Sequence, residues 1–431
     1  MSKLLTNTSF LYQLFTQTNL FPYPSDTTDS KFWKKDRKGN PIPSKNMLKQ
    51  HERAKDAMCR MVAESVNAFA ASGYGTKSAC LDTEDFLFSS TEIKALFGRM
   101  PTFYEWNDTW KVFDKSAVHL SAKYAGYNNA KPCGYIWNLQ FKSKLASLME
   151  SIANDTCTVR REDIEKAPHE VPEEYDLVTY ITPNIQALRE TITSKEFSLD
   201  ARLYAWAYCQ VAEYYNGRVP QYYHKTKNSD RYYGFGKLNI QCCPKKLRNV
   251  IMSGYNQYDL NASCVSILCS VANGHYPTLQ RYASQTKAFR FGICNRWESY
   301  GLDVESVKTA ITATLFGWNI NNQKYSSVKL PGSFTYCLAQ DYEYLNIKKE
   351  FAELKDELFP DLGKKERQLQ ASKFYQTLET RIMSFVRNST YDPSDCLMVH
   401  DCIYTKDYID IEEVRNEIDY IYGVQIQIKE E

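Results

Sequence analysis

The chain has 431 residues, of which 43% are hydrophobic and 14% aromatic, and its formal net charge is +2. This length and composition exclude a disordered chain and allow two or three domains with a large buried core. The near-neutral charge excludes a uniformly basic coat, so any face that binds nucleic acid must be local. The longest apolar run, Cys264 to Ala272, is too short to span a membrane, so no membrane partner is expected.

The 13 cysteines include no Cys-x-x-Cys pair and are scattered through apolar segments. We therefore expect reduced thiols in the core, in place of disulfides or zinc ligands. The first residues lead into polar Thr and Asn and lack the long apolar stretch of a signal peptide. A cytoplasmic location is the expectation.

Residues 1–195 are expected to form a mainly helical N-terminal region that serves as a thumb or binds the template, with helices that include residues 58–69 and 139–152. Between Lys31 and Lys55 there are nine Lys or Arg against two acids, with Phe32 and Trp33 among them. This pattern is equally typical of a nucleic-acid contact and of a solvated loop and helix face.

A short acidic motif also lies in this region. Asp82 and Glu84 have a spacing found in metal-dependent nucleases, although a helix-capping loop explains the pair as well.

A Pro-containing, charge-rich segment at residues 160–175 predicts a joint before the second domain, which we place at 196–431. Ser198 is expected to cap a helix that runs to about Tyr215. A second basic stretch, residues 217–249, then carries eight cations against one acid. We expect it to contact phosphates through four of these cations, Arg218, Arg231, Lys246 and Arg248.

Two lone carboxylates occupy distinctive places. Asp259 lies where an apolar strand is expected to turn into an apolar helix, and Asp401 lies in a tight turn between two β-prone runs. Alone, each aspartate is more often a cap or turn residue. After Asp401 the order strand, acidic helix, strand is expected, and charged amphipathic helices are expected at 347–358 and 368–386.

A third stretch, between the aspartates, has helical character. Lys308, Thr312 and Phe316 are spaced i, i+4, i+8, near one face of a helix, and Gly317 follows. A cation there can reach triphosphate oxygens, an aromatic ring can stack under a base, and a glycine permits close approach. An ordinary helix with an exposed Lys and a buried Phe would show the same spacing.

The order Asp, then Lys-x7-Phe-Gly, then His-Asp resembles motifs A, B and C of the single-subunit RNA polymerases of phages and mitochondria and of family A DNA polymerases. The resemblance covers residues 218–431. It implies that Asp259 and Asp401 hold two Mg²⁺ ions, that Lys308 contacts the triphosphate, and that His400 supports the product end. Phe316 and Gly317 would lie beside the nascent base pair, and Thr312 is expected to be among the nucleotide-binding residues.

The chain also departs from the family pattern. Phe316 lacks the phenolic hydroxyl of the usual Tyr, and Val304 stands where an Arg is found four residues before the Lys. Cys264 occupies the position of the Glu with which the DNA polymerases exclude ribose. The resemblance therefore implies an RNA-synthesising enzyme.

The expected fold is α+β: a right-hand polymerase palm with an antiparallel sheet, helical fingers and a mainly helical N-terminal region. The expected function is that of a DNA-directed RNA polymerase or primase. Its partners would be a DNA template, nucleoside triphosphates and an RNA product. If the enzyme acts in transcription, a second polymerase subunit would be a further partner. Such a compact enzyme would suit a phage and its host cytoplasm, by analogy. A minimal DNA polymerase and a non-catalytic nucleic-acid-binding replication protein are the alternatives.

Overall fold

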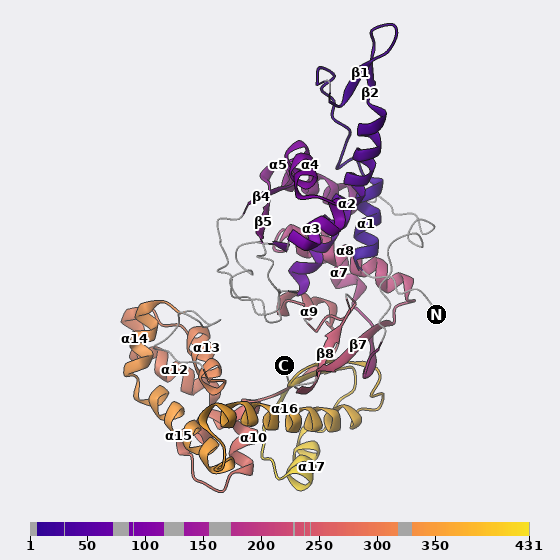
Figure 1. Cartoon of the computed structure of the whole chain (residues 1–431). Helices are drawn as coiled ribbons and strands as arrows, with labels where there is room; N and C mark the ends of the chain where they lie inside the picture. The colour runs from indigo at the N-terminus through magenta and orange to yellow at the C-terminus, as the bar shows by residue number, and fades with distance from the viewer. Residues whose placement is uncertain are drawn as a thin grey trace. The chain divides into compact units, whose positions relative to one another are not determined.

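The structure of the chain is a computed structural model (Figure 1). The residues that it describes are 7–29, 31–71, 86–88, 90–115, 133–154, 174–226, 229–236, 238–241, 243–317 and 330–430. Asp82, Glu84 and almost all of the joint expected at 160–175 lie outside these residues. In the described part, no helix combines the length and apolar character needed to cross a membrane.

The chain divides into two compact units that are each discontinuous in sequence. Unit 1 contains Met1–Glu173, Thr182–Gln221 and Phe235–Ser253, and unit 2 contains Glu174–Ile181, Tyr222–Gly234 and Gly254–Glu431. The backbone passes between the units several times, so this division does not coincide with one cut after residue 195. Helices dominate both units, and the strand pairings of known register are antiparallel, which agrees with an α+β class.

Unit 1 is mainly helical in its described part. Helices α1, α2 and α8 pack against one another, and α7 packs on α8. The Ser198 side chain accepts a hydrogen bond from the Ala201 backbone N–H, so the cap expected for α8 is confirmed. The helices of unit 1 are α1 Asn7–Gln17, α2 Lys45–Ala71, α3 Ser90–Phe97, α4 Met100–Trp110, α5 Leu139–Ala153, α7 Ile185–Thr193, α8 Leu199–Tyr214 and α9 Lys245–Ile251.

The strands outside the main sheet of unit 2 form small sheets. Strands β1 and β2 pair as a hairpin, β5 lies between β3 and β4, and β7 lies between β6 and β8. Their bounds are β1 Trp33–Lys35, β2 Pro41–Pro43, β3 Phe86–Phe88, β4 Phe113–Lys115, β5 Cys133–Trp137, β6 Leu177–Ile181, β7 Val219–Thr226 and β8 Ser229–Phe235.

Unit 2 is built around a four-stranded antiparallel sheet in the order β10, β11, β9, β12. The strands are β9 Asn256–Leu260, β10 Cys396–Val399, β11 Cys402–Thr405 and β12 Ile428–Glu430. The order of elements expected after residue 396 is confirmed. Tyr258 and Leu260 of β9 are buried in the core, whereas Asp259 between them is half-buried, because successive side chains of a strand point to opposite faces.

Helices pack around this sheet. Helix α16 contacts α10, α15 and β11. Helix α15 begins five residues earlier than expected, because the Asp341 side chain accepts hydrogen bonds from the backbone N–H groups of Glu343 and Tyr344. The helices of unit 2 are α10 Ser263–Val271, α11 Pro277–Ser284, α12 Thr286–Arg296, a 3-10 turn at Glu298–Tyr300, α13 Val304–Leu315, α14 Gly332–Gln340, α15 Tyr342–Leu358, α16 Lys364–Asn388 and α17 Ile411–Tyr422.

Candidate active site

The sheet of unit 2 brings the two candidate metal ligands together. Cys402, the first residue of β11, pairs with Asp259 of β9, and Asp401 precedes Cys402 in the turn. The Leu260 backbone N–H donates to the backbone carbonyl of Asp401 at 2.8 Å. Asp259 and Asp401 are 142 positions apart in sequence (401 − 259). In the structure a backbone hydrogen bond joins Asp401 to Leu260, the residue that follows Asp259.

A chain of hydrogen bonds leads from Asp401 into the core. Ser263, the first residue of α10, donates from Oγ to Asp401 Oδ2 at 3.2 Å and lies 3.1 Å from the Tyr375 hydroxyl on α16. Arg231 of β8 donates from Nη2 to that hydroxyl at 2.6 Å. Each hydroxyl has one proton, so when Ser263 donates to Asp401, its contact with Tyr375 is a hydrogen bond only if the tyrosine is the donor.

Arg231 also forms an ion pair with Glu379, which lies one turn after Tyr375 on α16. The Glu379 side chain is fully buried, with an exposed fraction of 0%. Burial raises the pKa of Glu379 to about 7, even though Arg231 lowers it. Among the described residues no donor reaches the second carboxylate oxygen, Oε1, so one side of this carboxylate is desolvated without compensation.

Asp401 experiences the same kind of environment. Burial raises its pKa above the ordinary value, while Arg231, the Ser263 hydrogen bond and Lys308 oppose that rise. The positive charge supplied by the chain thus compensates only part of the cost of burying this carboxylate.

The third stretch lies on α13 and just after it. Lys308 is exposed, with 49% of its side chain accessible, and its Nζ lies 3.3 Å from Glu305 Oε1. Thr312 is exposed one turn later. The helix ends at Leu315, so Phe316 is a C-cap residue and not part of the expected continuous helix.

Phe316 and Gly317 pack toward α16. The Phe316 side chain is 41% exposed, and its ring centroid lies 6.1 Å from that of Tyr375. Gly317 has φ +88°, and a Cβ there would lie 3.2 Å from Gln368 Cγ. In this structure the close approach at Gly317 is therefore made by Gln368 of the same chain.

His400 and Cys264 also adjoin the aspartates. His400 precedes Asp401 in the turn with φ +53°, its ring centroid is 5.6 Å from that of Tyr233, and burial lowers its pKa to about 4. A neutral imidazole at physiological pH follows. Cys264 is buried, and burial raises the pKa of its thiol, so it contributes a neutral side chain to the hydrophobic core of unit 2.

The second basic stretch differs from the expected row of exposed cations. The Arg231 guanidinium is held in the core by Glu379 and Tyr375. Arg248 is half-buried and donates to the backbone carbonyls of Gln241 and Cys243. These two arginines stabilise the fold because acceptors of the same chain bind the Nη2 atom of Arg231 and the Nη1 atom of Arg248. The count of charges in the sequence does not reveal these contacts.

The other two cations of the stretch are exposed. Lys246 donates to the Glu196 carbonyl at 3.0 Å and lies over the Phe197 ring, and Arg218 follows α8 at the surface of unit 1. They remain candidates for phosphate contact, whereas Arg231 belongs to the other unit.

Sequence reasoning overlooked Ser263 and Tyr375. The available signal for Ser263 was its position four residues after Asp259 at the start of a helix. Tyr375 and Glu379 are spaced i, i+4 on an amphipathic helix, a spacing that places both side chains on one face.

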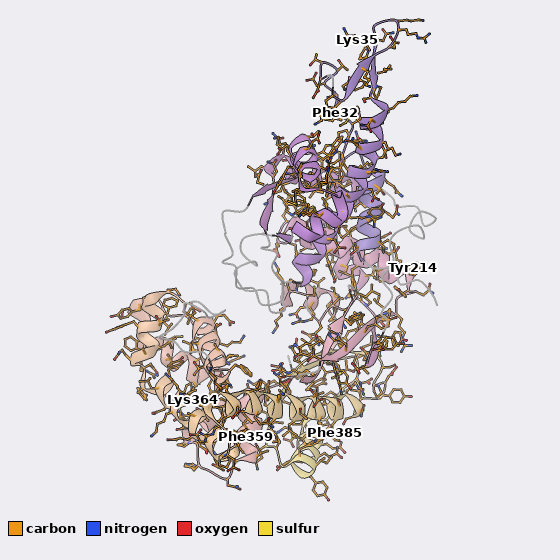
Figure 2. All side chains as sticks on the ribbon, in the orientation of Figure 1. Phe32, Lys35, Tyr214, Phe359, Lys364 and Phe385 are labelled. Carbon is orange, nitrogen blue, oxygen red and sulfur yellow. The ribbon has the colours of Figure 1, made fainter. Side chains whose placement is uncertain are left out.

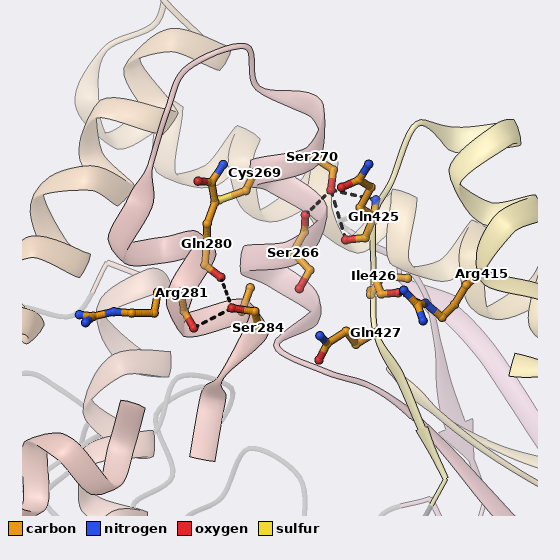
Figure 3. A pocket seen from close by; sticks show the side chains of 11 residues that line it. Ser266, Cys269, Ser270, Gln280, Arg281, Ser284, Arg415, Gln425, Ile426 and Gln427 are labelled. Carbon is orange, nitrogen blue, oxygen red and sulfur yellow. Dashed lines mark hydrogen bonds between the residues drawn. The ribbon is translucent and has the colours of Figure 1, made fainter. Parts of the chain in front are cut away.

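A pocket of about 550 Å³ lies elsewhere on unit 2, bordered by α10, α11 and residues 425–427 (Figure 3). Several of its polar groups are engaged within the chain. The Ser270 hydroxyl donates to the Ser266 carbonyl, Arg415 donates to the Ile426 carbonyl, and Arg281 pairs with Glu343. We assign no role in the candidate site to this pocket.

Asp259 and Asp401 are the residues of this site that could hold a metal ion. Carboxylate oxygens are the ligands that Mg²⁺ prefers, and one or two protein carboxylates suffice when substrate phosphates supply the rest. Groups of three or more His, Cys, Asp or Glu side chains suited to a metal are not found in the described residues. Comparison of the sequence with protein-family models and with curated proteins finds no match.

Proposed function

We propose that the chain is a template-directed nucleotidyltransferase that makes RNA on a DNA template, as an RNA polymerase or primase. The observation that carries the proposal is the meeting of the three stretches in unit 2. Asp401 adjoins Asp259 through the Leu260 hydrogen bond, and Ser263 and Tyr375 connect Asp401 to Phe316. In this proposal the four-stranded sheet is the palm and the helices around α13 are the fingers.

The two aspartates fit a pair of Mg²⁺ ions by their chemistry. Burial raises the pKa of Asp401, so an added cation beside it would favour the ionised form that a metal needs. When bound, two such ions would align the attacking and leaving oxygens and neutralise charge in phosphoryl transfer. Ser263 orients the Asp401 carboxylate for that role through its hydrogen bond to Oδ2.

The other residues of the site would bind the incoming nucleotide and the template. Lys308 is exposed and can neutralise triphosphate oxygens, and the partly exposed Phe316 can stack against a base. His400 is neutral and can offer a nitrogen to the product end. At the position where DNA polymerases of the resembled family carry a ribose-excluding Glu, Cys264 leaves ribose unopposed by a carboxylate.

The test is synthesis by the purified protein with Mg²⁺, single-stranded or primed DNA, and either ribo- or deoxyribonucleotides. The matched control is Asp401→Asn, which preserves the shape of the side chain and removes its charge. RNA products from wild type that are absent with the variant would support the proposal. Extension with deoxyribonucleotides alone would indicate a minimal DNA polymerase, and DNA binding without any product would indicate a non-catalytic replication protein or a missing second subunit.

A further inference from the structure

The β1–β2 hairpin of unit 1 carries an exposed cluster of cations that the candidate active site does not use. We propose that this hairpin, with the first turns of α2, binds the phosphate backbone of a nucleic acid. The two strands are antiparallel, and Trp33 of β1 lies opposite Pro43 of β2. Just after β2 the chain enters α2, which begins at Lys45 (Figure 1). This surface lies in unit 1, so its binding can be measured independently of nucleotide transfer in unit 2.

The base of the hairpin is firmly anchored. The Tyr23 hydroxyl donates to the Phe32 carbonyl at 2.6 Å, and the Trp33 indole N–H donates to the Pro24 carbonyl at 3.0 Å. Phe32 is buried, with its ring centroid 5.7 Å from that of Trp106. A hairpin held in this way presents its side chains in a fixed arrangement, so binding does not require the backbone to become ordered.

The acidic residue of the hairpin, Asp36, forms its hydrogen bonds within the turn. The Asp36 carboxylate accepts hydrogen bonds from the backbone N–H groups of Lys38 and Asn40, at 2.8 Å each. These bonds hold the pKa of Asp36 below its ordinary value. Asp36 thus stabilises the turn and is poorly placed to neutralise cations on the strands.

Four cations of the hairpin point into solvent without ion-pair partners among the described residues: Lys34, Lys35, Arg37 and Lys38. Lys35 and Phe32 are labelled in Figure 2, with Lys35 on the outer part of the hairpin and Phe32 at its base. Lys31 differs, because it pairs with Glu105 of α4. Exposed Lys45, Lys49 and Arg53 extend the positive surface along the start of α2.

The chemistry of the hairpin favours a polyanion over a membrane or a partner strand. Of the large apolar side chains of the hairpin, Ile42 is 44% exposed and Trp33 is half-buried. Little apolar surface is therefore available for insertion into lipid. Pro41 and Pro43 lack N–H donors, which weakens β2 as an edge for another strand. Closely spaced cations match the regular charges of a nucleic-acid backbone.

The experiment measures binding of fluorescent 20-nucleotide single-stranded and duplex DNA by anisotropy, without nucleotides or Mg²⁺, across a salt series. The variant exchanges Lys34, Lys35, Arg37 and Lys38 for Gln. Each phosphate contact contributes about 0.9 to the salt slope for duplex and about 0.7 for single strands, so four lost contacts should reduce the slope by about 3. We expect affinity to fall roughly 10–100-fold at moderate salt, from the same counterion release.

The matched control removes the same charge from exposed lysines of unit 2, as Lys348→Gln, Lys349→Gln, Lys364→Gln and Lys365→Gln, and should bind as wild type does. Equal affinity and salt slope for wild type and the hairpin variant would overturn the proposal. So would hairpin-dependent binding to phosphatidylglycerol vesicles without binding to either DNA. Thermal unfolding of both variants verifies folding, and Lys35→Glu alone supplies a milder test with the same expected direction.

Discussion

Arg231 and the cations of the β1–β2 hairpin come from equally basic stretches of sequence but have opposite environments. Arg231 is enclosed by Tyr375 and Glu379 in the core of unit 2, whereas Lys34 and Lys35 are exposed and unpaired among the described residues. A buried cation compensates carboxylates of its own chain, and an exposed one is available to a partner. The local density of Lys and Arg does not distinguish these roles, but the contacts do.

The largest expected effect is a loss of RNA synthesis without a loss of DNA binding. If Asp259 holds a catalytic metal, Asp259→Asn should reduce RNA synthesis at least about a thousandfold, which is about 4 kcal/mol in the barrier, and leave DNA affinity unchanged. Single-turnover extension and anisotropy measure the two quantities. Asp419→Asn, an exposed exchange on α17, should leave both unchanged. Synthesis by Asp259→Asn within tenfold of wild type would remove Asp259 from the site.

The second effect concerns stability and directly contrasts the two kinds of cation. Arg231→Gln removes the positive charge that lowers the pKa of both Glu379 and Asp401, so we expect the free energy of unfolding at pH 8 to fall by about 3–5 kcal/mol. Lys35→Gln should change it by no more than about 0.5 kcal/mol, because the side chain is exposed. Urea unfolding compares the variants, and equal losses would contradict the contrast.

A smaller effect should appear as a pH dependence in the wild type. The pKa of Glu379 is about 7 in the folded chain and about 4.5 ordinarily, so the folded state binds the proton more tightly. Its contribution to the free energy of unfolding should be greatest below pH 4.5 and be lost as pH rises to 7, by up to about 3 kcal/mol.

The variant Glu379→Gln should remove that part of the pH slope in urea unfolding. Glu353→Gln, an exchange at an exposed ion pair on α15, should retain it. An unchanged slope in Glu379→Gln would mean that Glu379 is ionised throughout this range.

The smallest effect tests the hydroxyl that links Asp401 to the core. Ser263→Ala removes the donor to Asp401 Oδ2 and the contact with Tyr375, so it should lower the free energy of unfolding by about 1 kcal/mol. It should also weaken Mn²⁺ binding, measured by electron paramagnetic resonance, if the hydroxyl orients a metal ligand. Ser284→Ala, at an exposed serine of α11, is the matched control and should leave metal binding unchanged.

The local elements of this fold could be predicted from sequence, since their signals are local. Ser198 marks the start of α8, and residues 396–405 read as two strands with a two-residue turn. The strand-to-helix change after Asp259 is likewise present as β9 and α10. In each case the cap, the turn or the apolar spacing lies within a few residues of the feature that it specifies.

The arrangement of the site could be predicted only in part. The resemblance in the order of the motifs predicts that the two aspartates belong to one site. The pairing of β9 with both β11 and β12 depends on contacts between distant segments, which no local pattern encodes. The same holds for Arg231, whose partners lie about 150 residues away on α16. No periodicity near residue 231 encodes a partner on that helix, so its burial could not be inferred.

The position of β9 between β11 and β12 also has a consequence on the ribosome. Strand β9 is complete at residue 260, but its neighbours are complete only at residues 405 and 430. At about 5–20 residues per second, translation of the intervening segment takes roughly 10–30 s. During that interval the nascent chain carries Asp259 on a strand with two unpaired edges, so Asp259 and Asp401 cannot yet come together, and those edges must be kept from pairing with other chains.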